Sequence, residues 1–172
     1  AGIDNCLITL NAPELPILDG SAIEYAEKID EVGIVEQDAE KDYYIVKQKI
    51  EVIDEKTGSS LIVLPDEDFS IDTMIEFDSS ILQNQFASLN SMKRFKSDIA
   101  ASRTFVFVRE IVALLNANLI KGGDLDNAIV IYDQPMSQEQ LNKISELMGV
   151  PPVEVANLGY INNKPLVFPN EP

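Results

Sequence analysis

The chain has 172 residues and a mass of 19.1 kDa, which is enough for one domain of ordinary size with a buried core. It carries 13 Lys and Arg against 29 Asp and Glu, and this net charge of −16 disfavours nucleic-acid binding. It contains no histidine, which excludes the Ser-His-Asp and Cys-His catalytic systems and leaves no imidazole to bind zinc.

The N-terminal part of the chain predicts a strand followed by a helix. Residues 6–10 are apolar and rich in β-formers, so they predict the strand. Ser21 and Glu24 have the spacing of a capping box, which predicts that the helix begins there. Gly33 stands where a glycine commonly ends a helix.

Residues 34–42 are acidic and lose hydrophobic periodicity, which is typical of a linker. We therefore expect a domain boundary here, with residues 1–38 in one domain and residues 39–172 in another. Four extended segments follow, and the turn residues between them suit an antiparallel meander. These segments are residues 43–54, 59–64, 69–77 and 83–89.

The rest of the chain predicts two serine-capped helices on either side of a β-α-β unit. Ser91 can cap the first, short helix. The β-α-β unit covers residues 104–131 and has a helical apolar face between its two strands. Ser137 begins the last helix with Gln140 as its capping-box partner, and Gly149 ends it. The apolar faces comprise Met92, Phe95 and Ile99 in the first helix, Val108, Ile111, Val112, Leu115 and Leu119 in the unit, and Leu141, Ile144 and Leu147 or Met148 in the last helix.

A local excess of positive charge interrupts the acidic chain. Residues 92–121 contain six basic residues, against only Asp98 and Glu110. This patch can bind a small anion such as a diphosphate, or it can be a helix face that pairs with neighbouring acids. The basic residues are Lys93, Arg94, Lys96, Arg103, Arg109 and Lys121.

Two apolar features also allow two interpretations. The stripe from Val108 to Leu119 can line a lipid passage or pack on its own flanking strands. Phe77 can stack on a nucleobase or pack in the core. Taken alone, both features fit core packing better.

Three stretches of the sequence, in this order, resemble the UDP-3-O-acyl-N-acetylglucosamine deacetylases, the bacterial zinc amidases of lipid A synthesis. The resemblance covers almost the whole chain. It implies an α+β fold in which residues 39–172 form a two-layer sandwich of sheet and helices with a β-α-β insert at 104–131, and residues 1–38 form the tail of a first domain. The stretches are residues 2–5 with 13–22, which include Pro-Ile-Leu-Asp-Gly-Ser-Ala, then Arg-Thr-Phe-Val-Phe at 103–107, and Gly-Gly-Asp-Leu-Asp-Asn-Ala-Ile-Val at 122–130.

The family's zinc ligands and general base lie in segments before and after the matched stretches. The resemblance therefore implies an internal piece of a zinc-dependent hydrolase, with no zinc bound by this chain and no deacetylase activity of its own. The lone Cys6 fits a reducing compartment, and we expect a cytoplasmic protein. No apolar run reaches the roughly 18 residues that a membrane span needs.

The resemblance also assigns roles to individual residues. Thr104 matches the threonine that donates a hydrogen bond to the tetrahedral oxyanion. Asp19 matches an aspartate near the floor of the active site, which supports the residues around it. The positions that match substrate-binding residues are Phe105 at the mouth of the acyl passage, Ile111, Leu114, Ile120 and Gly123 along it, and Glu76 with Phe77 near the uridine.

The implied substrate is UDP-3-O-acyl-N-acetylglucosamine, from which the parent enzyme removes the N-acetyl group. The segment from residue 138 matches an extra element of a lineage fused to an acyl-carrier-protein dehydratase. Missing strands would leave sheet edges that pair between chains, so we expect self-association. The rival interpretation is a non-catalytic acidic α+β domain whose basic patch binds an anionic partner.

Overall fold

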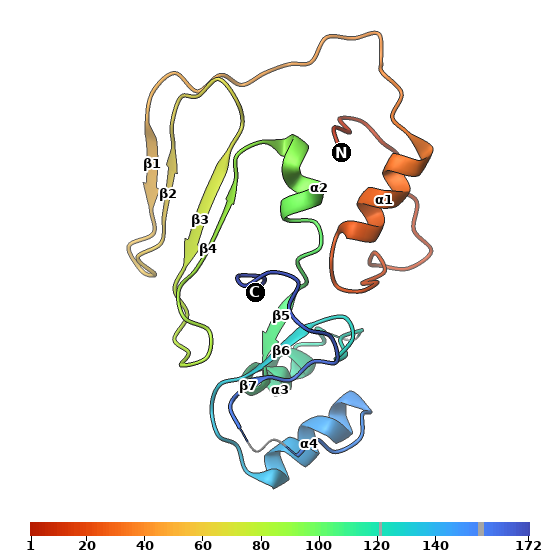
Figure 1. Ribbon diagram of the computed structural model, residues 1–172, viewed down its shortest axis with the longest axis vertical. Helices are drawn as coiled ribbons and strands as arrows, with labels where there is room; N and C mark the ends of the chain where they lie inside the picture. The colour runs from red at the N-terminus through yellow and green to blue at the C-terminus, as the bar shows by residue number, and fades with distance from the viewer. Residues whose placement is uncertain (121, 155–156) are drawn as a thin grey trace.

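The computed structural model describes residues 1–120, 122–154 and 157–172 (Figure 1). Helices and short strands are mixed along the chain, which confirms the predicted α+β class. In chain order the elements are α1 (Ile23–Val32), β1 (Ile50–Ile53), β2 (Ser60–Val63), β3 (Ile71–Ile75), β4 (Gln85–Leu89), the 3-10 turn η1 (Met92–Arg94), α2 (Phe95–Asp98), β5 (Phe105–Phe107), α3 (Val108–Asn116), β6 (Ile129–Tyr132), α4 (Gln138–Met148) and β7 (Gly159–Tyr160).

The strand predicted at residues 6–10 does not form. This segment is exposed, with Leu7 at 92% exposure, and no other strand of the described chain lies beside it to supply hydrogen bonds. The helix α1 does form, but its N-cap is Ala22, which makes no side-chain capping bond. The Ser21 hydroxyl donates to Asp19 and accepts from the Ile23 amide, and the predicted capping box with Glu24 does not form. Gly33 ends α1 as predicted, with φ of +76°.

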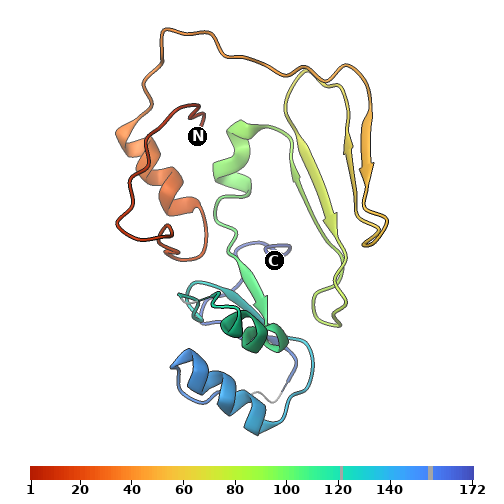
Figure 2. The same cartoon turned by 180° about the vertical axis from the view of Figure 1, so that it is seen from behind.

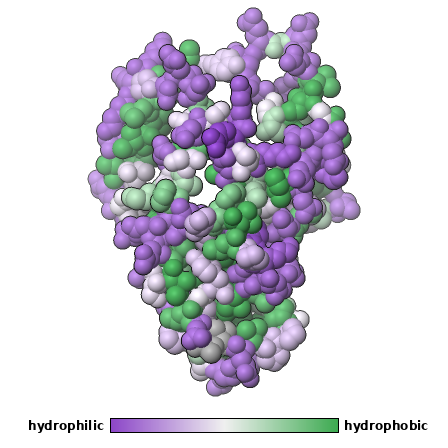
Figure 3. All heavy atoms as spheres, viewed as in Figure 1, coloured by the Kyte–Doolittle hydropathy of each residue, from purple (hydrophilic) through white to green (hydrophobic). Residues whose placement is uncertain are grey.

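Two separate antiparallel hairpins replace the predicted meander. Strand β1 pairs with β2 and β3 pairs with β4, and within the described residues these are two sheets. The connection between β2 and β3 contains Pro65 and three acidic residues, so it does not make the tight turn that would continue the ladder. Apolar side chains stay on the hairpin surface, among them Met74 at 75% and Phe86 at 63% exposure (Figure 3).

The β-α-β unit forms as predicted. Strands β5 and β6 are parallel, with Phe105 opposite Ile129, and α3 connects them. The two-residue strand β7 adds antiparallel to β6 and was too short to be predicted. Helix α3 ends at Asn116, so Leu119 lies beyond it and is half exposed, contrary to the prediction. Asn118, with φ of +64°, turns the chain here, because asparagine tolerates this conformation.

Both serine-capped helices are confirmed. The Ser91 hydroxyl accepts from the Lys93 amide at the start of η1, which continues into α2. Ser137 and Gln140 form the full capping box of α4, and Gly149 ends that helix in the left-handed conformation. None of the helices in the described ranges has both the length and the apolar character to cross a bilayer.

The core lies on both faces of β5 and β6. Because successive side chains of a strand point to opposite faces, β6 contributes to two apolar clusters. One cluster is covered by α3 and α4, which stack at the same end of the molecule (Figure 2). The first cluster comprises Val108, Ile111, Val130, Tyr132, Leu141 and Ile144, and the second comprises Leu82, Phe107, Ile129 and Ile131.

Candidate functional site

Three segments that are far apart in the sequence meet at Gly20. The Gly20 carbonyl accepts from the Thr104 amide at 3.0 Å, and the Thr104 carbonyl accepts from the Ile129 amide at 2.8 Å. Gly20 has φ of +85°, and a Cβ placed on it would lie 1.9 Å from the carbonyl oxygen of Asn127. Backbone contacts therefore join the three stretches that carry the family resemblance.

Asp19 holds the turn that leads into α1. Its Oδ1 accepts from the Ser21 amide at 3.0 Å and from the Ser21 hydroxyl at 2.8 Å. Burial raises the pKa of Asp19, but the Ser21 hydrogen bonds and the charge of Lys164 outweigh it and lower that pKa. The carboxylate is therefore ionised at neutral pH and braces the loop that contacts Thr104.

A buried ion pair lies directly before Thr104. The Nε atom of Arg103 lies 2.7 Å from Oε1 of Glu171, and the two side chains are 3% and 0% exposed. Arg103 also donates to the Pro165 carbonyl at 2.8 Å, and Glu171 accepts from the Val167 amide at 2.6 Å. The pair thus ties the C-terminal segment to β5. Arg103 belongs to the basic patch of the sequence, whereas no local sequence signal marks Glu171 as its partner.

The stability of this ion pair is expected to depend on pH. Burial raises the pKa of Glu171, but hydrogen bonds from the Arg103 guanidinium and the Val167 and Arg103 amides outweigh it and lower that pKa. A lowered native pKa contributes stability above the usual glutamate value of about 4.3, and this contribution is lost as the pH falls through the native pKa.

We therefore expect Glu171→Gln to flatten the fall in unfolding free energy below about pH 4.3. Urea unfolding at a series of pH values measures how steeply the free energy of unfolding falls. Glu146→Gln, at an exposed position of α4, serves as the control and is expected to keep the wild-type slope. Equal slopes for Glu171→Gln and wild type would contradict the assignment.

An apolar cavity of about 360 Å³ opens beside Thr104. Of the residues predicted along the acyl passage, Leu114 is half-buried on α3 and is not among the described residues that line the cavity. A wall from α4, for which no site residue was expected, also contributes to the lining. The predicted residues that do line it are Thr104, Phe105, Ile111, Ile120 and Gly123, and the α4 wall comprises Leu141, Ile144, Ser145 and Met148.

Three aromatic rings pack edge to face beside the cavity. The Phe77 ring centroid lies 5.4 Å from that of Phe105 and 5.9 Å from that of Phe107. The Arg109 guanidinium lies over the Phe107 ring, with Cζ 4.2 Å from the centroid. Phe77 is therefore half-buried in the core next to a cavity-lining residue, whereas the preceding Glu76 is exposed.

The basic patch is largely neutralised in the structure. Four of its residues form ion pairs with acids, three of them between segments distant in sequence. This favours the interpretation of a basic face that pairs with neighbouring acids. Lys121 lies outside the described residues. The pairs are Arg94 with Asp98, Lys96 with Asp30, Arg103 with Glu171 and Arg109 with Asp133.

The donor set does not fit a zinc centre. Zinc sites in proteins use His, Cys and carboxylate ligands gathered around one point. Across residues 1–120, 122–154 and 157–172, no group of three such side chains is placed to hold a metal ion, and Cys6 is exposed.

Comparison with known proteins finds one family model and several similar sequences. The model of the UDP-3-O-acyl N-acetylglycosamine deacetylases, LpxC, matches residues 1–148. The chain is 63% identical over 170 residues to a bifunctional enzyme LpxC/FabZ of Bacteroides thetaiotaomicron and 57% identical over 171 residues to one of Porphyromonas gingivalis. It is 41% identical over 140 residues to the UDP-3-O-acyl-N-acetylglucosamine deacetylase of Helicobacter hepaticus.

These matches cover the chain far more completely than they cover the relatives. The two bifunctional enzymes match 99% of the chain but only 37% of their own length. The Helicobacter enzyme matches 81% of the chain and 46% of its own length. The chain thus spans less than half the length of each of these relatives.

Proposed function

Because the chain belongs to the family of UDP-3-O-acyl N-acetylglycosamine deacetylases, we propose that it is part of a longer zinc-dependent hydrolase that removes the N-acetyl group of UDP-3-O-acyl-N-acetylglucosamine. The proposal rests on the apolar cavity beside Thr104. All three stretches that define the resemblance contribute residues to its lining, and backbone hydrogen bonds join them. A lipid-like substituent and a polar reacting group would meet at that point.

The cavity is suited to the acyl chain of this substrate. Its volume of about 360 Å³ lies within the range of roughly 300–1,000 Å³ typical of small-molecule sites, and its lining is mostly apolar. Phe105 and Gly123 line it together with Thr104, and Ile111 and Ile120 line it from α3 and the loop that follows. We place the acyl chain in this cavity, and the nucleotide near Glu76.

Thr104 is proposed to stabilise the oxyanion that forms when water attacks the amide carbonyl. Its backbone N–H and C=O are both engaged, with Gly20 and Ile129, so its hydroxyl is the group that meets the substrate. The same two hydrogen bonds hold the Thr104 backbone from both sides, and so fix the point from which the hydroxyl projects. A donor held in place before the reaction stabilises developing negative charge without reorganisation.

Zinc would supply an activated water and polarise the carbonyl in the whole enzyme. Since this chain contains no histidine, we propose that the metal ligands and the general base belong to other parts of the longer protein, and that the chain alone is inactive. The names of two relatives support a fused second module, which we propose is an acyl-carrier-protein dehydratase in a cytoplasmic enzyme. The exposed apolar hairpins would be covered in the longer protein and favour self-association in its absence.

Thr104→Ala in the longer enzyme is expected to lower kcat about 100-fold, because one oxyanion donor is lost. Deacetylated product and acetate are quantified by mass spectrometry. Thr104→Ser keeps the hydroxyl and is expected to retain most of the activity. Thr73→Ala, at an exposed position of β3, is the matched control. Absence of deacetylation by the wild-type enzyme would overturn the proposed function, and full activity of Thr104→Ala would overturn the role of Thr104.

A further inference from the structure

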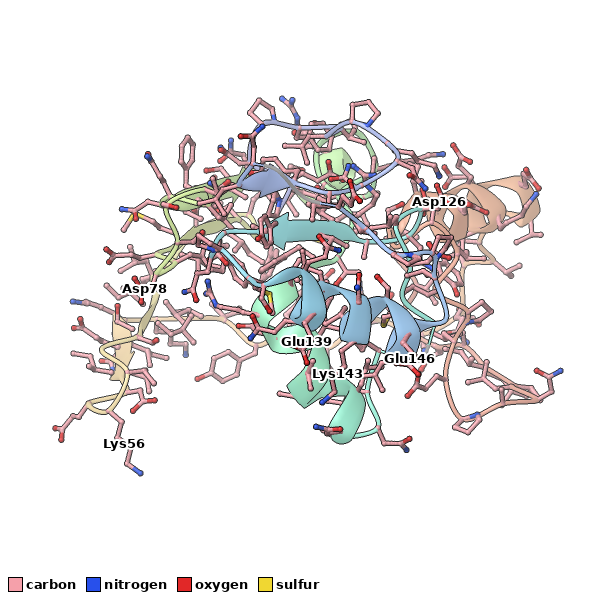
Figure 4. The ribbon with its side chains drawn as sticks, turned by 90° about the horizontal axis from the view of Figure 1, so that it is seen from below. Lys56, Asp78, Asp126, Glu139, Lys143 and Glu146 are labelled. Carbon is pink, nitrogen blue, oxygen red and sulfur yellow. The ribbon has the colours of Figure 1, made fainter. Side chains whose placement is uncertain are left out.

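Helix α4 presents opposite faces to the solvent and to the cavity. Leu141, Ile144 and Met148 line the cavity, and the first two are buried, at 6% and 7% exposure. Charged side chains occupy the solvent side and follow one another along the helix, as Lys143 and Glu146 show (Figure 4). The cavity is therefore enclosed by α4 as well as by the β-α-β unit.

This wall lies away from the proposed reaction point. Thr104 precedes β5, beside the Gly20 junction, whereas α4 lies beyond α3 at the opposite end of the molecule from α1 (Figure 1). The cavity lining continues past α4 into the following loop, where Val153 contributes. A chain that enters beside Thr104 would thus meet the α4 wall with its distal carbons.

The wall is held in a defined position. The Ser137–Gln140 capping box fixes the first turn of α4, and the Met136 amide donates to the Tyr132 hydroxyl at 2.9 Å, which anchors the approach to the helix. At the same end, Gln138 Nε2 donates to the Val153 carbonyl at 3.3 Å and joins the start of α4 to the loop that follows the helix. A fixed wall sets a limit on the length of an apolar ligand, because packed interiors resist deformation.

We propose that Met148 of α4, together with Val153, sets the longest acyl chain that the deacetylase accepts. This inference rests on the proposed function and names a specificity determinant within its site. Met148 is suited to this position because it lies at the last turn of α4, lines the cavity and is only half-buried, so its size can change without removing a central core residue. Its neighbour Leu147 is 48% exposed and lies outside the lining.

The test measures kcat/KM of the longer enzyme on UDP-3-O-acyl-N-acetylglucosamines that differ only in acyl-chain length. Met148→Trp is expected to lower kcat/KM for the longest accepted chain at least about tenfold relative to the shortest, because added volume shortens the cavity. Met148→Ala is expected to shift the preference to longer chains. Val153→Phe is a second filling variant that keeps the test decisive where Met148→Trp fails to fold.

Leu147→Ala is the matched control and is expected to keep the wild-type chain-length profile. If the enzyme deacetylates the substrates but the Met148 and Val153 variants all keep that profile, the α4 wall does not set chain length. If the wild-type enzyme deacetylates none of them, the proposed function itself fails, and the inference falls with it.

Discussion

Gly20→Ala is expected to destabilise the junction around Thr104 by about 3–5 kcal/mol, through backbone strain and a steric clash together. The residue has φ of +85°, which L side chains rarely adopt. The added Cβ would also lie 1.9 Å from the Asn127 carbonyl oxygen and 2.8 Å from the carbonyl carbon. Both neighbours are backbone atoms, so no side-chain rotation relieves the clash.

Hydrogen exchange at the Thr104 amide reports on the stability of this junction. Because the Thr104 amide donates to Gly20, hydrogen exchange at this amide is expected to accelerate in the variant, by roughly 100-fold or more. Gly33→Ala is the matched control: Gly33 has φ of +76°, but nothing lies within 4 Å of its Cβ position. The difference between the two variants isolates the contact with Asn127. If both variants lost the same stability, backbone strain alone would explain the loss, and the close approach of Gly20 to Asn127 would contribute nothing.

Arg103→Met is expected to lower the free energy of unfolding by about 3–5 kcal/mol, because it leaves the buried Glu171 carboxylate without its cation. The Glu171 side chain is 0% exposed, so water does not replace the lost guanidinium. The substitution also removes the hydrogen bond that Arg103 donates to the Pro165 carbonyl. Urea unfolding of the longer enzyme, followed through a probe near the C-terminal segment, measures the loss.

Arg94→Met is the matched control for this substitution. Arg94 pairs with Asp98 at 2.7 Å, but its side chain is 66% exposed, and such surface pairs contribute only about 0–1 kcal/mol. Adding Glu171→Gln to Arg103→Met is expected to recover part of the loss, since the uncompensated charge is removed. Comparable small losses for Arg103→Met and Arg94→Met would contradict a structural role for the buried pair.

The elements that local signals define were predictable from the sequence. Helix α4 begins with a four-residue capping box and ends at Gly149. In the β-α-β unit, the spacing of apolar residues changes between that of a strand and that of a helix within 28 residues. The strand at residues 6–10 was wrong because β-propensity requires a neighbouring strand, which the described chain does not provide. The meander failed for the same reason, since pairing between hairpins is not a local property.

For the site, the residues that resemble the family could be recognised from the sequence, and the structure places Thr104, Phe105 and Gly123 in the lining of one cavity. The neighbours of these residues depend on the packing of distant segments. The Arg103–Glu171 pair joins residues 68 positions apart, and the α4 wall faces a cavity that also includes Ile17. Periodicity and capping act over a few residues of one segment, whereas a buried charge partner and a cavity wall depend on which distant segments pack together.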